Sequence, residues 1–265
     1  MTAAIRSFIA FFLCCSSIVA EENSFRFVAI IMDDLGNDGH IGSEVIALPY
    51  DLTYSFLPHT KYAKKLIARA NQNRKEIMLH LPMQPISNKE MGKGGLKSNM
   101  HQAQFLEILR NNIQAVPGAI GINNHMGSLL TQDHIKMTWL MQELKENKSL
   151  YFVDSRTHGG SIAAVRARAF NIPTATRDIF LDHVVEEEEI DSQFHHLLSR
   201  INSVGYALAI GHPHEHTLKA LKKWLPRLQA EGIEIVTVSQ YIALENMRNL
   251  MWQASLSRSH KVVKN

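Results

Sequence analysis

The chain contains 265 residues, of which 45% are hydrophobic and 20% are charged, and its formal net charge is +3. This composition is typical of a folded globular protein and excludes collagen-like, fibrous and intrinsically disordered chains. The 28 basic residues are nearly balanced by 25 acidic residues. Because a dedicated nucleic-acid-binding protein would carry a clear basic excess, we expect no nucleic-acid partner.

The first twenty residues have the pattern of a signal peptide. Arg6 gives a short positive region, and the apolar stretch 7–19 is too short to span a bilayer comfortably. Cleavage after the small residue Ala20 would leave residues 21–250 as one domain and 251–265 as a basic polar tail. We therefore expect an exported protein, periplasmic or extracellular, with no transmembrane span after signal cleavage. An uncleaved N-terminal anchor is the alternative.

Strand-like apolar runs then alternate with segments of helical periodicity. The predicted strands are 25–32, 52–57, 76–79, 119–122, 150–153, 206–210 and 233–238. The predicted helices are 60–72, 102–116, 131–146, 162–170, 190–204 and 217–231, and a terminal helix begins at Ser239. A long loop rich in Gly, Pro and Ser occupies 82–99. This alternation predicts an α/β fold with a mostly parallel sheet, open or closed into a barrel.

Acidic residues and histidines follow five of the predicted strands. In chain order they are Asp33 and Asp34, His80, His125 with the preceding Asn124, Asp154, and His212. Parallel sheets bind their ligands at the carboxyl ends of the strands. We therefore expect these side chains to form one functional site.

The residue types favour metal chemistry at this site. Adjacent residues that leave a strand point in different directions, so Asp33 and Asp34 can take different roles, one as a base and one as a ligand. A neutral imidazole at His80 or His125 can bind Zn²⁺, and a buried histidine satisfied by hydrogen bonds is the structural alternative. One carboxylate and two imidazoles, with positions left for water, are typical of a catalytic metal site.

Further polar residues are candidates for a role beside the metal. His212 follows Gly211, which permits close approach of a substrate, and an unligated imidazole there can act as a general acid. The candidates for substrate contact or for support of the site are Asn124, Asp154, Arg156, Arg177 and Asp178. Structural ion pairs are the alternative for the charged members.

Six segments together resemble the divergent polysaccharide deacetylase family, a distant branch of the NodB-type carbohydrate esterases. They are 29–36 (AIIMDDLG), 79–85 (LHLPMQP), 121–128 (GINNHMGS), 154–157 (DSRT), 177–182 (RDIFLD) and 211–213 (GHP). The resemblance implies a distorted seven-stranded (β/α) barrel with mostly parallel strands over residues 21–250. It also implies a divalent metal such as zinc and a polysaccharide or peptidoglycan substrate carrying N-acetyl groups.

The resemblance also implies roles for individual residues. Asp33 corresponds to the catalytic base of these enzymes, Asp34 to a metal ligand and His212 to the general acid. Their His-x-x-x-His motif is broken here, because His125 matches its first position and Leu129 stands at its second. We therefore expect His80 to supply the missing ligand.

Two further functions stay open beside that of a metal-dependent deacetylase. One is a non-catalytic exported protein that binds glycans or assists envelope assembly through the same cleft. The other is a metal hydrolase acting on a different ester or amide. For the deacetylase we expect the 82–99 loop to form one wall of the sugar groove. Met83 and Met91 are candidates to line this groove, and ordinary core packing is the alternative for both.

Overall fold

The computed structural model describes residues 25–146 and 150–262, with side chains as far as Gln253. The predicted signal peptide, 1–20, lies outside the described residues. Strands occupy β1 (Arg26–Leu35), β2 (Thr53–Phe56), β3 (Glu76–Met83), β4 (Gly121–Met126), β5 (Tyr151–Asp154), β6 (Thr174–Thr176), β7 (Ile179–Phe180), β8 (Tyr206–Gly211) and β9 (Ile233–Val236). Helices occupy α1 (Gly39–Ile46), α2 (Ala63–Gln72), α3 (Gln102–Ala115), α4 (His134–Glu146), α5 (Ala163–Ala169), α6 (Glu187–Val204), α7 (Glu215–Ala230) and α8 (Val238–Val262).

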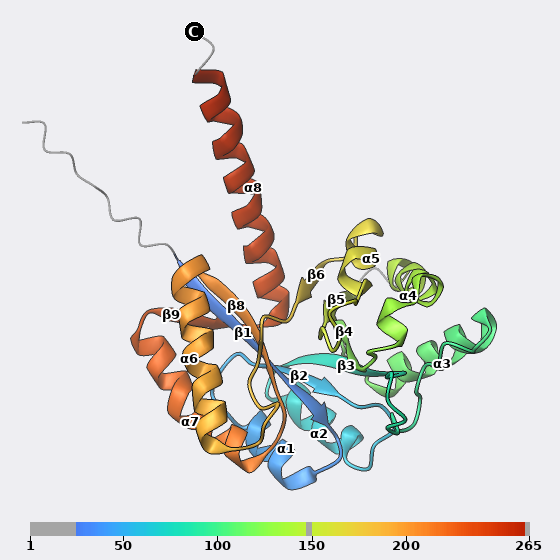
Figure 1. Ribbon diagram of the computed structural model, residues 1–265. Coiled ribbons are helices and arrows are strands. Elements are labelled where there is room, and N and C mark those ends of the chain that lie inside the picture. Colours follow the sequence, from blue (N-terminus) through green and yellow to red (C-terminus); the bar gives the residue numbers. More distant parts are fainter. Residues whose placement is uncertain (1–24, 147–149, 263–265) are drawn as a thin grey trace, which may run out of the picture.

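The strands form one sheet in which each pairing is parallel (Figure 1). The hydrogen-bonded order is β6-β5-β4-β3-β2-β1-β8-β7, and β9 pairs with the first part of β1. This arrangement confirms the predicted distorted (β/α) barrel. Within the described ranges the sheet has nine strands rather than seven. Strands β6 and β7 were not predicted, because three and two residues are too few to show a periodic pattern.

A two-residue connection joins the two ends of the strand order. Arg177 and Asp178 link β6 to β7, and their backbone N–H groups donate to Asp154 O and Leu208 O, respectively. The Asp178 carboxylate in turn accepts a hydrogen bond of 2.9 Å from Leu208 N. These bonds continue the ladders of β5 and β8 across the seam, which explains how such short strands hold the distorted barrel together.

Alternate residues of β1 enter two different hydrophobic cores. Val28, Ile30 and Met32 pack in the larger core with residues of the surrounding helices. Phe27, Ala29 and Ile31 pack in a smaller core with residues of β3, β5, β8 and the first turn of α8. A strand buried on both faces reads as a continuous apolar run, as β1 does, and its period of two sends neighbours to opposite faces. The smaller core therefore marks the inner face of the curved sheet.

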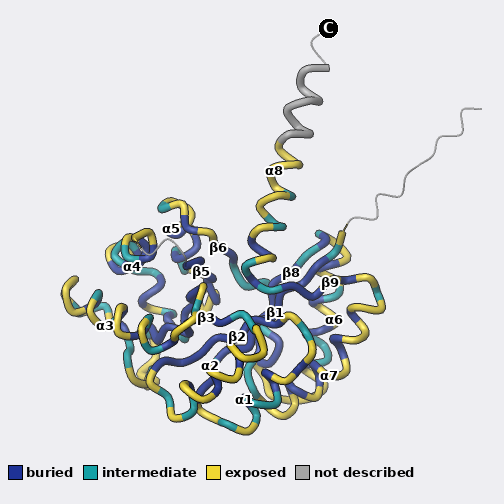
Figure 2. The backbone as a smooth tube through the Cα atoms, turned by 180° about the vertical axis from the view of Figure 1, so that it is seen from behind, coloured by how far each residue is buried: buried dark blue, intermediate teal, exposed yellow. Residues whose placement is uncertain are grey.

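The helices cover the outer face, except α8, which projects from one end of the sheet (Figures 1 and 2). Helix α1 was not predicted, because its sequence contains two glycines and shows little apolar periodicity; Asp38 caps it by accepting from the N–H groups of His40 and Ile41. Helix α8 extends through most of the predicted 251–265 tail. No helix among the described residues combines the length and apolar character needed to cross a membrane.

Candidate metal centre

The inner face of the sheet changes from apolar to polar at the carboxyl ends of the strands. On β1, Asp33 follows Ile31 at a spacing of two, and on β3, His80 follows Met78 in the same way. On β4, Asn123 and His125 are two residues apart and share one face, and Ile122, which precedes Asn123, packs on the other face in the larger core. His212 likewise follows Ile210 on β8. Strand periodicity alone therefore places these polar side chains above the apolar inner core.

Asp34 reaches the same place by a different route. The pairing of β1 with β2 shifts register between Met32 and Leu35, and Asp34 lies within that irregularity with a left-handed φ of 56°. Regular alternation would direct Asp34 away from Asp33 and toward the outer face. The irregularity instead aims both carboxylates at the mouth of the barrel, at the cost of a backbone conformation that non-glycine residues rarely adopt.

Asp34, His80 and His125 bring one ligand atom each to a common point. Asp34 Oδ1 lies 3.1 Å from His80 Nε2 and 2.9 Å from His125 Nδ1, and the two ring nitrogens are 3.2 Å apart. Ligand atoms about 2.0–2.1 Å from a tetrahedral zinc ion would be about 3.3 Å from one another. Asp34 Oδ1 is buried, yet it has no well-oriented hydrogen bond within the described part of the chain. The three atoms therefore fit a shared cation better than a hydrogen-bonded cluster.

Asn123 determines which nitrogen of His80 faces this point. Its amide nitrogen donates to both carboxylate oxygens of Asp33, at 2.8 and 3.1 Å. Since a carboxylate only accepts, the amide oxygen of Asn123 must face the other way, toward Ser55 Oγ at 2.6 Å and His80 Nδ1 at 2.8 Å. His80 Nδ1 then carries the proton, which leaves the lone pair of Nε2 available to a metal.

The charges at the centre alter one another's pKa. Burial would raise the pKa of Asp34, but the facing imidazoles of His125 and His80 hold it far below its usual range. Burial is the largest influence on Asp33 and raises its pKa, although His80 and His212 oppose the effect. For His80, burial disfavours the charged ring, yet Asp33 and Asp34 raise its pKa. The carboxylate of Asp34 is thus held in its charged form by the two imidazoles that face it.

His212 lies beside the three candidate ligands, oriented by Asp182. Its Nε2 is 3.9 Å from Asp34 Oδ2, and its Nδ1 is 2.8 Å from Asp182 Oδ1. The other oxygen of Asp182 accepts from the backbone N–H of His212 at 2.6 Å and from Thr217 Oγ1 at 2.7 Å. Burial opposes protonation of the ring, but Asp182, Asp33 and Asp34 raise the pKa of His212 to about 9. A protonated Nε2 therefore points toward the metal centre.

Four of the remaining predicted residues bind backbone groups around the site, whereas the fifth, Arg156, is exposed. Asn124 donates to Met126 O and accepts from Ser155 N. Asp154 accepts from the backbone N–H of Arg156 and Ala164 and from Ser161 Oγ. Arg177 donates to the carbonyls of Ser155 and Arg156, and its charge also interacts with Asp33. Together with Asp178 at the seam, these side chains brace the loops that follow β4, β5 and β6.

Sequence reasoning missed the two residues that orient the histidines. It selected Asn124 rather than Asn123, although a spacing of two from His125 would have placed Asn123 on the inner face. It did not include Asp182 among the site residues, although Asp182 lies in the 177–182 segment that resembles the family. That residue lies far from His212 along the chain, so their contact depends on the pairing of β7 with β8.

A cleft of about 280 Å³ opens directly onto the metal centre. Its lining includes Asp34 and His125 and, from the 82–99 loop, Glu90, Met91 and Lys93. The loop thus lines the cleft, as predicted, and Met91 contributes to the lining. Met83 does not line the cleft, because it is fully buried in the larger core at the end of β3.

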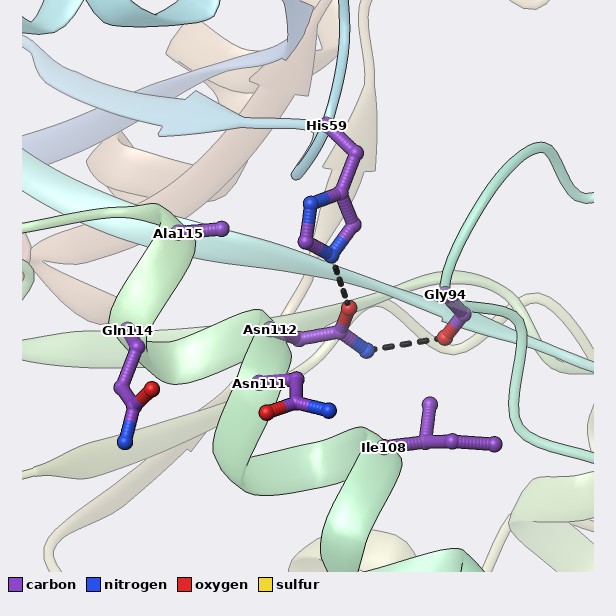
Figure 3. A pocket seen from close by; sticks show the side chains of 7 residues that line it. All are labelled: His59, Gly94, Ile108, Asn111, Asn112, Gln114 and Ala115. Atoms are coloured by element: carbon purple, nitrogen blue, oxygen red, sulfur yellow. Dashed lines mark hydrogen bonds between the residues drawn. The ribbon is translucent and has the colours of Figure 1, made fainter.

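Asn112 of α3 links the 82–99 loop to the loop after β2 that carries His59. It is completely buried, and its amide donates to Gly94 O at 2.8 Å and bonds His59 Nε2 at 3.1 Å (Figure 3). Gly94 adopts a left-handed φ of 81°, and a Cβ at this position would lie 2.1 Å from Asn112 Oδ1. The close approach requires glycine and fixes the end of the cleft wall that carries Lys93.

A parallel α/β barrel with an Asp-His-His cluster at the carboxyl ends of its strands is the architecture that the sequence resemblance implied. Residues 30–242 match the family described as divergent polysaccharide deacetylase. Since the match covers most of the chain, the protein belongs to this family.

Relatives and solved structures are similar to this chain in sequence or in fold. An uncharacterized protein of Haemophilus influenzae is 35% identical over 238 residues, which cover 88% of this chain and 82% of that protein. The structure of an uncharacterized protein from Agrobacterium tumefaciens has a TM-score of 0.78 and 22% identity, and the match covers 82% of this chain and 89% of that one. A peptidoglycan deacetylase of Bdellovibrio bacteriovorus has a TM-score of 0.51 and 13% identity, with 81% and 52% covered. These structures are similar to this chain in fold.

Proposed function

We propose that the protein is an exported, metal-dependent carbohydrate deacetylase that hydrolyses N-acetyl groups of a polysaccharide or peptidoglycan. The observation that carries the proposal is the convergence of Asp34, His80 and His125 on one point, with the buried Asp34 Oδ1 lacking a well-oriented hydrogen bond within the described residues. Membership of the deacetylase family supports the reaction class. The fold shared with a peptidoglycan deacetylase supports the substrate class.

Asp34, His80 and His125 would hold the metal, and a set of two imidazoles and one carboxylate suits zinc. A divalent cation bound there would polarise the acetamide carbonyl and lower the pKa of water to about 7. Asn123 contributes by keeping His80 in the tautomer that can bind a cation. Asp33, through Asn123, keeps that amide in its required orientation.

Two protons must move during amide hydrolysis, and this chain offers a residue for each. Asp33 accepts the proton of the attacking water, and its burial favours this step by raising its pKa. The water oxygen bonds to the carbonyl carbon as the proton leaves. His212, protonated through its pairing with Asp182, then donates from Nε2 to the nitrogen as the carbon–nitrogen bond breaks. The products are acetate and a free amine on the sugar.

The lining of the cleft and the signal-like pattern of residues 1–20 support an extracytoplasmic glycan as substrate. Glu90 and Lys93 on the loop line the same cleft as Asp34 and His125 and provide polar groups for sugar hydroxyls or charged substituents. The signal-like pattern of 1–20 would deliver the protein to the compartment that contains such polymers.

The decisive experiment measures acetate release from oligomers of N-acetylglucosamine and from peptidoglycan fragments, with zinc content determined on the same samples. We expect Asp33→Asn and His212→Ala to retain zinc and lose acetate release, and His80→Ala and His125→Ala to lose both. Stoichiometric zinc in both histidine variants would exclude this metal site. Glycan affinity without acetate release, in the presence of any divalent metal tested, would instead establish a non-catalytic glycan-binding protein.

A further inference from the structure

Helix α8 leaves the domain after its first turns. Tyr241 and Ile242 are buried in the inner core at the amino end of the barrel. Nearly two turns later, Arg248 Nη1 donates to Phe25 O at 3.2 Å. Beyond this contact the helix projects away from the body of the protein (Figure 1).

The first part of the projecting segment carries an unusual concentration of exposed apolar side chains. Met247 is 49% exposed, Leu250 66%, Met251 62% and Trp252 67%. Met247, Leu250 and Met251 follow the helical spacing of three and four, so they share one face. Isolated exposed apolar residues are ordinary, but four within six positions indicate a contact surface.

The charged residues of the chain from residue 246 onward are all basic. From residue 246 to the end of the chain there are four Lys or Arg residues and no Asp or Glu, although the whole chain is nearly neutral. Large apolar side chains with a tryptophan, combined with basic residues, are typical of helices that lie in the interface of a bilayer containing anionic lipids. A basic segment also disfavours pairing of two copies of this helix side by side, because their charges would repel.

The geometry of the barrel suits such a contact. Helix α8 and the start of β1 at Arg26 lie at the amino end of the sheet, whereas Asp34 lies at the carboxyl end of the same strand (Figures 1 and 2). A strand of this length spans about 30 Å. A membrane bound at the α8 end would therefore leave the cleft open on the far side of the molecule.

We propose that the segment of α8 bearing Met247, Leu250, Met251 and Trp252 docks on the surface of an anionic lipid bilayer. The inference does not depend on catalysis at the metal centre. It assigns the helix the role of holding the barrel at a membrane, with its cleft directed away from the lipid.

Tryptophan fluorescence of the full chain tests the docking directly. Trp224 is fully buried and Trp139 packs between Phe105 and Lys136, so the exposed Trp252 will dominate any change in emission. We expect a blue shift, and quenching by brominated lipid, with vesicles of phosphatidylglycerol and phosphatidylcholine. Vesicles of phosphatidylcholine alone should give neither effect, and added salt should weaken both. Trp252→Phe should abolish the signal.

Co-sedimentation with the same anionic vesicles supplies the second measurement. The double variant Leu250→Ser, Met251→Ser should bind at least about tenfold more weakly, because it removes two of the four apolar side chains that would enter the interface. Ile135→Ser on α4, where the side chain is 60% exposed, is the matched control and should bind like the wild type. All variants retain residues 1–24, so the difference isolates α8.

Three results would overturn the proposal. Unchanged Trp252 emission with anionic vesicles would show that the helix does not enter the interface. A dimer that the double variant dissociates would identify a second copy as the occupant of this surface. Trp252 emission that is already at short wavelength without vesicles, and that moves to longer wavelength in the double variant, would show that another part of this chain covers the helix.

Discussion

The side-chain oxygen of Asn123 lies 2.8 Å from His80 Nδ1, and this contact sets the tautomer of a candidate metal ligand. The amide can take this orientation because its nitrogen donates to Asp33 on the other side. The candidate base and the candidate ligand are therefore coupled through a single buried amide. Removing that amide should affect both the metal and the fold.

We expect Asn123→Ala to weaken zinc binding about 10–100-fold, as loss of a residue that orients a ligand commonly does. It should also lower the free energy of unfolding by about 1–3 kcal/mol, because the buried Asp33 loses its donor. Calorimetric titration with zinc and urea denaturation measure the two effects. Asn111→Ala, at an exposed position of α3, is the control. Wild-type zinc affinity in Asn123→Ala would contradict the proposed orienting role.

Metal removal should destabilise the protein. At free zinc one hundred times the dissociation constant, binding to the folded state alone stabilises it by about 2.7 kcal/mol. A chelator should remove this contribution and lower the melting temperature of the wild type. His125→Ala should melt at the same temperature with and without zinc. His101→Ala, at the exposed start of α3 where its side chain makes no capping bond, should respond to zinc like the wild type.

Asp182→Asn should impair acetate release without loss of metal. The substitution removes the largest of the influences that raise the pKa of His212 to about 9, so less of the ring is protonated and its orientation is disturbed. We expect kcat to fall about 100-fold or more, within the range of general acid catalysis. Zinc content should stay at the wild-type level.

Thr217→Val is the milder comparison for Asp182→Asn, since it removes one hydrogen bond to the Asp182 carboxylate. It should lower the free energy of unfolding by about 1 kcal/mol.

An unchanged kcat in Asp182→Asn would show that His212 does not act as the acid. Loss of zinc in this variant would place Asp182 in support of the metal instead.

Asn112→Leu should release the wall of the cleft. The variant loses the bonds to Gly94 O and His59, and the 82–99 loop contains Lys89 and Lys93, which are exposed. We expect trypsin to cleave at these lysines several-fold faster, because cleavage requires local opening of the loop. Asn111→Leu should be cleaved like the wild type. Equal cleavage of both variants would show that other contacts hold the loop.

Much of the fold was predictable because local patterns agree with it. The seven longer strands appear as apolar runs that a turn or a polar residue ends, and the order of strands and helices requires parallel pairing. Helix α1 and strands β6 and β7 were missed because two glycines weaken the helical pattern and short strands carry almost no periodicity. Tertiary pairing with β5 and β8 stabilises those strands.

Local sequence patterns were sufficient to predict the family resemblance, the parallel barrel and the gathering of Asp33, His80, His125 and His212 on one face. Those four follow from alternation along strands whose carboxyl ends meet. Only the tertiary structure decided how Asp34 joins them, since it depends on an irregular pairing of β1 with β2 and a left-handed backbone. Only the structure, likewise, showed Asn123 and Asp182 as the residues that orient the rings. Such contacts join segments far apart in the chain, and no local pattern encodes the distance between them.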